Sequence, residues 1–333
     1  MRRREFITLL SSAAACPLVA RAQQLSQDHR IAFMHPTASI GEMSEAGGNP
    51  GFRALFQELR RLGHVEGRNL VVERYSAEGG GPTRYAELIP KLEATNPELI
   101  LAVSNSVVLS LKTVTDSIPI VAFMADPVTY RIVTSLARPG GNITGVTGDS
   151  GLEIWAKRLQ ILLAAIPTAS KVGFLTRVWR SPQTNALQEA AREAGIALLG
   201  PSLEDPVNDT EYRRVLGMMV EEHADGLIVG DTAANFTNRQ VIVDLVQRAR
   251  LPTIYPYHEH VDIGGLIAYA SPPADLWRRM AGQIDEILKG SKPSEMPIFR
   301  ASKFELLVNL KTAKSLGLTI PPTLLARADE VIE

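Results

Sequence analysis

The sequence contains one cysteine and almost no net charge. Its 35 basic and 36 acidic residues leave a formal charge of -1 over 333 residues. Without a basic surplus, attraction to a nucleic-acid backbone is not expected. With Cys16 alone, a disulfide framework is excluded. Charge and cysteine content therefore argue against nucleic-acid partners and thiol chemistry.

The sequence also lacks an apolar run long enough to span a bilayer comfortably, and its best candidate lies at the N-terminus. Three arginines at positions 2–4 precede an apolar stretch over 6–19, and an A-x-A pattern follows at 20–22. We therefore expect residues 1–22 to be a cleaved signal peptide and the mature protein to be periplasmic. The arginine pair followed by EFI resembles a twin-arginine signal, and an ordinary secretion signal is the alternative.

Cys16 lies inside this leader, so cleavage after residue 22 would leave a mature chain without cysteine. The preceding AAA could form a degenerate lipoprotein box with Cys16. It lacks the large aliphatic residue expected three positions before the cysteine, so we do not expect lipid anchoring at Cys16.

After the leader, short apolar runs typical of strands alternate with amphipathic stretches typical of helices. Over 52–62, apolar side chains recur at three- and four-residue spacing, which predicts a helix. The run LILAV at 99–103 is apolar throughout, as expected of a parallel strand covered on both faces. Because the alternation occurs twice, the sequence predicts an α/β protein with two Rossmann-like, doubly wound parallel sheets.

A turn-rich stretch at 139–142 (PGGN) marks the boundary between the two halves. We expect lobe 1 to comprise 29–145 together with the tail from about 270 to 333, and lobe 2 to comprise 146–269. Within lobe 2, one continuous helix is expected over 235–249.

Ligands bind open α/β sheets beyond the carboxyl ends of the strands, and polar and aromatic side chains follow the predicted strands in both halves. Hydroxyls and helix N-termini can hold a carboxylate, a carboxylate can pair with an amine, and tyrosines can cover an apolar group. The predicted ligand-binding residues are Thr37, Ser104, Asn105, Ser106, Asp126, Arg177, Asp231, Tyr255 and Tyr269.

Most of these candidates also have a purely structural interpretation. Ser104, Ser106 and Asp231 could cap helices, and Asp126 before a proline could form a turn. Arg177 could be a solvated surface residue. The placement of the whole set at strand ends carries the prediction.

The sequence offers little for catalysis. The histidines of His258-Glu259-His260 are two apart, whereas a helical zinc motif needs them four apart. Neither a G-x-S-x-G elbow nor a P-loop is present, and 140–145 lacks the dinucleotide-binding spacing. His35 could act as a base, but no activated nucleophile accompanies it. We therefore predict a binding protein, not an enzyme, with no catalytic residue, metal or cofactor.

Several stretches resemble the ABC-transporter substrate-binding family that includes tryptophan/tyrosine-type binding proteins, a group of type I periplasmic binding proteins. They are LRRLGHVEGRN at 59–69, ARPGGNITGVT at 137–147 and, most specifically, the tail KFELLVNLKTAKSLGLTIPPTLLARADEVIE at 303–333. The resemblance implies two lobes joined by a hinge. It also implies a monomer that closes on a small molecule, an amino acid or related carboxylate, and delivers it to an inner-membrane ABC permease.

The sequence departs from the family pattern near the expected cleft, with TYRI at 129–132, RVWR at 177–180 and AYA at 268–270. The ligand can therefore differ from an aromatic amino acid. Three other functions stay open: a ligand sensor that signals to a membrane receptor, the effector half of a transcription regulator, and a secreted enzyme on the same scaffold.

Overall fold

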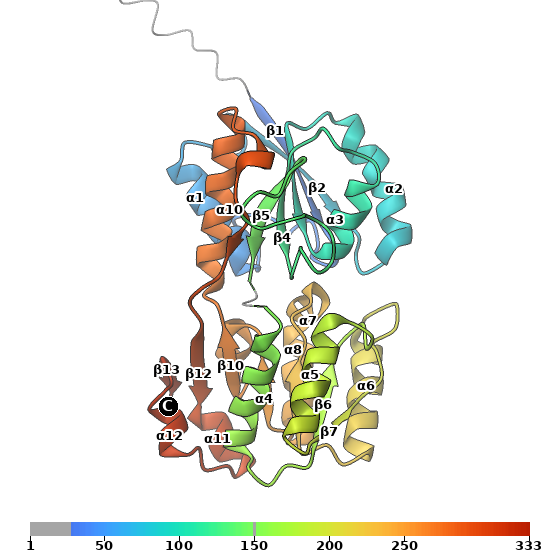
Figure 1. Cartoon of the computed structure of the whole chain (residues 1–333). Coiled ribbons are helices and arrows are strands. Elements are labelled where there is room, and N and C mark those ends of the chain that lie inside the picture. Colours follow the sequence, from blue (N-terminus) through green and yellow to red (C-terminus); the bar gives the residue numbers. More distant parts are fainter. Residues whose placement is uncertain (1–27, 149–150) are drawn as a thin grey trace, which may run out of the picture.

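Two lobes, each built around one sheet, make up the computed structural model, which describes residues 28–148 and 151–333 (Figure 1). The predicted signal peptide and Cys16 lie outside the described residues. In lobe 1 all strand pairs are parallel. The strands follow the order β11 (Phe299–Arg300), β5 (Ile143–Thr147), β4 (Ile120–Met124), β3 (Leu99–Val103), β1 (His29–His35) and β2 (Leu70–Ser76).

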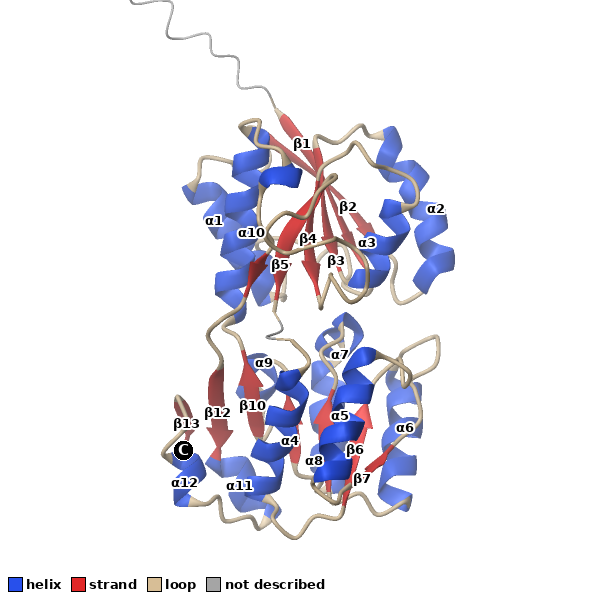
Figure 2. Ribbon diagram, in the orientation of Figure 1, coloured by secondary structure: helices blue, strands red, loops and turns tan. Residues whose placement is uncertain are grey.

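Helices cover both faces of this sheet (Figure 2). One face packs against α1 (Pro50–Arg61) and α10 (Pro273–Leu288). The other packs against α2 (Gly81–Ala94) and α3 (Asn105–Lys112). Every residue of β3 is buried between these layers, which explains its uninterrupted apolar sequence.

The start of α1 shows how local sequence sets this packing. Asn49 caps the helix by accepting hydrogen bonds from the amides of Gly51 and Phe52, and Pro50 occupies the first turn. A β-carbon on Gly51 would lie 2.3 Å from the Trp277 ring, so only glycine lets α1 approach α10 this closely. Trp277 is thereby held at the cavity end of lobe 1.

Lobe 2 contains a second, mixed sheet. The strand order is β13 (Glu330–Ile332), β12 (Glu305–Asn309), β10 (Ile267–Ala270), β9 (Thr253–Tyr255), β8 (Gly226–Val229), β6 (Lys171–Leu175) and β7 (Ala197–Leu199). Only the β10–β12 pair is antiparallel among these described strands.

Helices also cover both faces of the second sheet. One face carries α4 (Glu153–Ala165), α5 (Pro182–Glu193), α11 (Leu310–Leu316) and α12 (Pro322–Leu325). The other carries α6 (Asp209–Glu221), α8 (Arg239–Ala249) and α9 (His258–Asp262). The short helices α7 (Ala233–Thr237) and η1 (Pro293–Glu295) lie in connections. The predicted α/β class with two parallel-sheet lobes is confirmed.

The predicted lobe boundaries need correction. The chain passes between lobes after β5, after β10 and after β11. Residues 303–333 do not return to lobe 1, because β12 pairs with β10 and β13 pairs with β12 in the second sheet. Figure 1 shows the C-terminus in lobe 2 accordingly. An apolar run predicts a strand but not which sheet edge it joins.

The helix predicted over 235–249 is also interrupted. It divides into α7 and α8 at Asn238, whose ψ of 21° departs from the helical value. The buried side chain of Asn235 donates to the carbonyl oxygens of Leu175 and Gly230, at 3.2 and 2.8 Å. This contact fixes α7 against the ends of β6 and β8, at the edge of the cavity.

Candidate ligand-binding site

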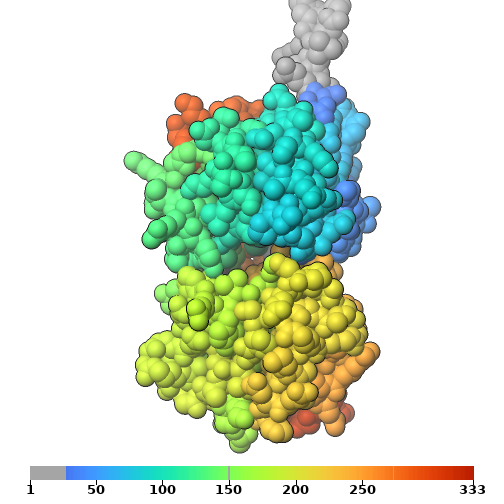
Figure 3. Space-filling view, turned by 90° about the vertical axis from the view of Figure 1, so that its right-hand side faces the viewer, coloured from blue at the N-terminus to red at the C-terminus, as the bar shows by residue number. Residues whose placement is uncertain are grey.

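A cavity of about 460 Å³ lies between the lobes, within the usual size range of small-molecule sites. Figure 3 shows the waist where the two halves of the chain meet. The cavity walls come from the segments after β1, β3 and β4 in lobe 1, and after β6, β8 and β9 in lobe 2. The carboxyl ends of both sheets therefore face one shared space, as expected for α/β folds.

The lobe 1 wall presents neutral polar groups. The hydroxyls of Ser104 and Ser106 are 2.8 Å apart, and Ser106 is 3.0 Å from the hydroxyl of Tyr85. Within the described part of lobe 1, no aspartate, glutamate, lysine or arginine lines the cavity. This wall therefore offers hydrogen bonds without a formal charge.

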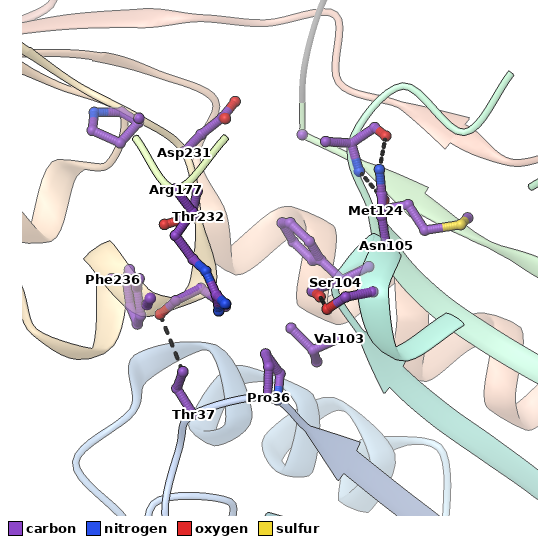
Figure 4. Close-up of a pocket in the computed structure, with 18 of the residues that line it drawn as sticks. Pro36, Thr37, Val103, Ser104, Asn105, Met124, Arg177, Asp231, Thr232 and Phe236 are labelled. Atoms are coloured by element: carbon purple, nitrogen blue, oxygen red, sulfur yellow. Dashed lines mark hydrogen bonds between the residues drawn. The ribbon is translucent and has the colours of Figure 1, made fainter. Parts of the chain in front are cut away.

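The turn between β3 and α3 holds these hydroxyls in place. Ser104 has φ 88°, a conformation rarely adopted outside glycine, and its side chain does not cap α3. The Asn105 amide instead secures the turn: its Nδ2 donates to the Ala125 carbonyl at 2.7 Å, and its Oδ1 accepts from the Ala125 amide at 3.0 Å (Figure 4). The Asn105 side chain thus connects the ends of β3 and β4.

The lobe 2 wall, in contrast, carries charged side chains of both signs. Arg158 of α4 is 3% exposed and lies 3.9 Å from the Asp231 carboxylate. Its Nε donates to the Tyr269 carbonyl at 3.2 Å, and its guanidinium lies 4.9 Å from the centre of the Trp155 ring. Burial raises the pKa of Asp231, and the nearby Arg158 opposes that rise. Asp231 keeps 22% of its side chain exposed, so it remains available to a ligand.

Arg177 occupies the rim of the same wall. Its Nη2 contacts both carboxylate oxygens of Asp205, at 2.7 and 2.8 Å. Arg177 and Thr232 of this wall both line the cavity (Figure 4). Because Asp205 already neutralises Arg177, this arginine adds less net positive charge than the sequence suggests.

Glu259 of α9 completes the charged set. Its Oε2 atom is buried and has no hydrogen-bond partner among the described residues. Burial raises the pKa of this carboxyl. Glu259 therefore gives the lobe 2 wall a second acidic group besides Asp231.

Aromatic rings from both lobes supply the apolar surface. Trp277 lies between Phe52 and Phe123, with ring centroids at 4.8 and 5.8 Å. In lobe 2, Phe236 meets Tyr257 edge to face at 5.2 Å. Such surfaces suit a flat apolar or aromatic group.

The lobes contact each other across the cavity mouth. The hydroxyls of Thr37 and Thr237 are 2.7 Å apart, and Thr37 also donates to the Ala233 carbonyl at 3.3 Å. On another side, the Tyr130 hydroxyl donates to the Gln183 side chain at 2.9 Å. Side chains of the two lobes are thus in direct hydrogen-bonding contact beside the cavity.

Comparison with known proteins agrees with this architecture. Residues 52–332 match the model of the family described as ABC transporter substrate binding protein. The chain belongs to this family. Its members bind substrates for transporters and are not enzymes. None of the described helices is long and apolar enough to cross a membrane.

Proteins similar to this substrate-binding protein have low sequence identity to it, and the solved structures among them share its fold. A tyrosine-binding protein of Clostridioides difficile (strain R20291) is 21% identical over 270 residues, covering 80% of this chain and 76% of the relative. An ABC domain from Streptococcus pneumonia in complex with L-Trp has a TM-score of 0.77 at 21% identity, covering 92% and 100%. A conserved domain protein of Vibrio cholerae has a TM-score of 0.79 at 20% identity, covering 91% and 99%.

The structure brings six of the predicted site residues to the cavity of this binding protein: Thr37, Ser104, Asn105, Ser106, Arg177 and Asp231. The structural alternative for Asp231 is wrong, because Thr232 caps α7 through the Asn235 amide.

The other three predicted residues do not line the cavity. Asp126 accepts a hydrogen bond from the Thr129 amide at 3.3 Å within its own turn. Tyr255 is 1% exposed and stacks on His260 at 4.8 Å. The Tyr269 ring packs on Phe304 at 5.7 Å, away from the ligand space.

Sequence reasoning missed several residues of the cavity wall. Arg158 and Trp155 lie three residues apart on α4. An arginine within the otherwise apolar face of this helix is the sequence feature that could have indicated them. Trp277 reaches the cavity from α10, a helix remote in sequence from the other lobe 1 segments. Glu259, in the segment after β9, is not among the ligand-binding residues predicted from the sequence.

Proposed function

We propose that this substrate-binding protein captures a small zwitterion with an aromatic group, an aromatic amino acid in the simplest case. The observation that carries the proposal is the combination of both charge signs with aromatic rings in one cavity. Arg158 and Asp231 can complement a carboxylate and an ammonium group, and the rings can enclose the side chain. The relatives named for tyrosine and L-Trp support this ligand class.

Lobe closure provides the capture mechanism. The ligand binds one wall of the open form and gains the contacts of the other wall when the lobes close. It favours closure only to the extent that it binds the closed form more tightly. The Thr37–Thr237 and Tyr130–Gln183 contacts support such a closed form. The closed form would then deliver its ligand to an inner-membrane ABC permease.

A thermal-shift screen tests the ligand class. The purified protein is heated with L-tryptophan, L-tyrosine, L-phenylalanine, sugars and purines, each at high concentration. A ligand present at one hundred times its dissociation constant stabilises the fold by about 2.7 kcal/mol. We expect a shift with at least one aromatic amino acid. A shift with sugars or purines alone would refute the proposal.

Export to the periplasm is a separate part of the proposal and rests on the leader described above. We expect the periplasmic form to begin at Gln23 and to lack Cys16. Mass spectrometry of the protein recovered from periplasm tests this. A lipidated N-terminal Cys16 would contradict it.

A further inference from the structure

His35, the last residue of β1, lines the cavity from lobe 1 and is 3% exposed. Its Nδ1 atom accepts hydrogen bonds from the backbone amides of Thr37 at 3.1 Å and Ala38 at 2.7 Å. A ring nitrogen that accepts carries no proton, so the proton of the neutral ring must lie on Nε2. The turn after β1 therefore fixes the tautomer.

The protonation state is fixed as well. Burial lowers the pKa of His35 to about 3, so the ring stays neutral at physiological pH. His35 accordingly cannot serve as a general base through Nδ1, whose lone pair is occupied. What remains to it is a single N–H donor.

That donor is directed to the cavity. Nε2 has no hydrogen-bond acceptor among the described residues, and the atom is not completely buried. Pairing of Met34 with Ala102 brings His35 alongside Val103, one residue before Ser104. His35 therefore belongs to the same neutral lobe 1 wall as the Ser104–Ser106 hydroxyl pair, on the side of that wall where its ring lies 6.0 Å from the Phe52 ring.

We propose that His35 is a ligand-binding residue that donates its Nε2–H to an oxygen atom of the captured molecule, a carboxylate oxygen in an amino acid. This proposal rests on the proposed function, because it assigns one contact within the same cavity. His35 recognises the acceptor by hydrogen bonding without adding charge. A group that can only donate, such as an ammonium, is excluded from this position.

Two substitutions separate the donor from the structural role of the ring. In His35→Asn, the amide oxygen can replace Nδ1 as the acceptor for the turn, and no atom reaches the Nε2 position. In His35→Gln, the longer amide can restore a donor near Nε2, and the acceptor for the turn is lost. His29→Asn, at the opposite end of β1, is the matched control.

Calorimetric titration with L-tryptophan measures the effect. We expect His35→Asn to weaken binding roughly 10- to 100-fold with little loss of melting temperature. His35→Gln should melt earlier but bind more tightly than His35→Asn, and His29→Asn should bind like the wild type. Wild-type affinity in His35→Asn would overturn the proposal.

Nitrogen-15 NMR of the imidazole groups distinguishes failure of this inference from failure of the proposed ligand. The free protein should show His35 as the neutral Nε2–H tautomer, and a proton on Nδ1 would overturn the inference whatever the ligand is. If the wild type binds no aromatic amino acid, the proposed ligand class is refuted, and the NMR result still decides the state of His35.

Discussion

The two walls of the cavity present different kinds of polar group. The lobe 1 wall offers His35, serine hydroxyls and Tyr85, all neutral, whereas the lobe 2 wall carries Arg158, Arg177, Asp231 and Glu259. Neutral donors keep their hydrogen-bonding capacity whether the lobes are open or closed, at little desolvation cost. Buried charges cost free energy when water leaves unless a partner is present. We infer that lobe 1 sets the position of the ligand. Lobe 2 then makes closure depend on the charges of the ligand.

The lobe 2 charges also have a structural role, and the largest expected effect follows from it. Arg158→Met should destabilise the fold by about 3 kcal/mol, because it leaves Asp231 in a confined site without its neighbouring cation. Chemical denaturation measures the change. The exposed pair of Arg213 with Asp209 is the matched control, and Arg213→Met should cost less than about 1 kcal/mol.

A double variant then separates stability from binding. Arg158→Met with Asp231→Leu removes both charges and should recover much of the lost stability, without recovering binding of L-tryptophan. Equal stability of the single and double variants would show that the charge pair is not what Arg158 contributes.

Asp231→Asn tests the charged wall with a change of a single atom. We expect binding of L-tryptophan to weaken by roughly 2–3 kcal/mol, because the ligand ammonium loses its counter-charge. Ser106→Ala in the neutral wall should weaken it by about 1 kcal/mol. Calorimetry on both variants measures the difference, and equal losses would remove the distinction between the walls.

Acid pH provides a comparison that does not need a ligand. Burial lowers the pKa of His35 in lobe 1 and of His260 in lobe 2 to about 3, whereas the unfolded value is about 6.5. The unfolded chain therefore binds these protons first, and stability falls as pH falls below about 6.5. At pH 5 each of these two histidines should lower the free energy of unfolding by about 2 kcal/mol.

The raised pKa values of Asp231 and Glu259 act in the opposite direction, since their folded forms take up protons first as pH falls. Differences between variants isolate the histidine contribution. His260→Phe and His35→Asn should each flatten the fall in unfolding free energy between pH 7 and pH 5. If the pH dependence of the unfolding free energy is unchanged in these variants, His35 and His260 are not buried as neutral rings.

The contacts across the cavity mouth should have the smallest effects. Thr37→Val removes the hydroxyl bonded to Thr237, and Tyr130→Phe removes the hydroxyl bonded to Gln183. Each should weaken binding by about 0.5–1 kcal/mol through a less favourable closed form. Small-angle scattering with saturating L-tryptophan should show a larger fraction of open molecules in the variant that combines Thr37→Val with Tyr130→Phe than in the wild type. An unchanged fraction would mean that ligand contacts alone hold the lobes together.

The sequence predicts the sheets better than it predicts their connections. Continuous apolar runs such as β3 indicate parallel strands covered on both faces, so both lobes could be predicted. The tail could not be assigned, because β12 joins the second sheet through backbone pairing with β10. Apolar periodicity carries no information on that partner.

The sequence predicts which residues line the cavity where strand ends decide their location, and it does not where packing decides it. Ser104 and Asp231 lie one and two residues after the ends of β3 and β8, and both line the cavity. Tyr255 also belongs to a strand end, but its side chain points into the core beneath His260. Trp277 reaches the cavity because Gly51 lets α1 and α10 come close, a contact that only the folded chain reveals.

Titration calorimetry with L-tryptophan, tryptamine and indole-3-propionate tests the central claim most directly. Tryptamine lacks the carboxylate assigned to His35 and Arg158, and indole-3-propionate lacks the ammonium assigned to Asp231. We predict that L-tryptophan binds and that each analogue binds at least tenfold more weakly. Binding of either analogue as tightly as L-tryptophan would show that the cavity does not recognise both charged ends of a zwitterion.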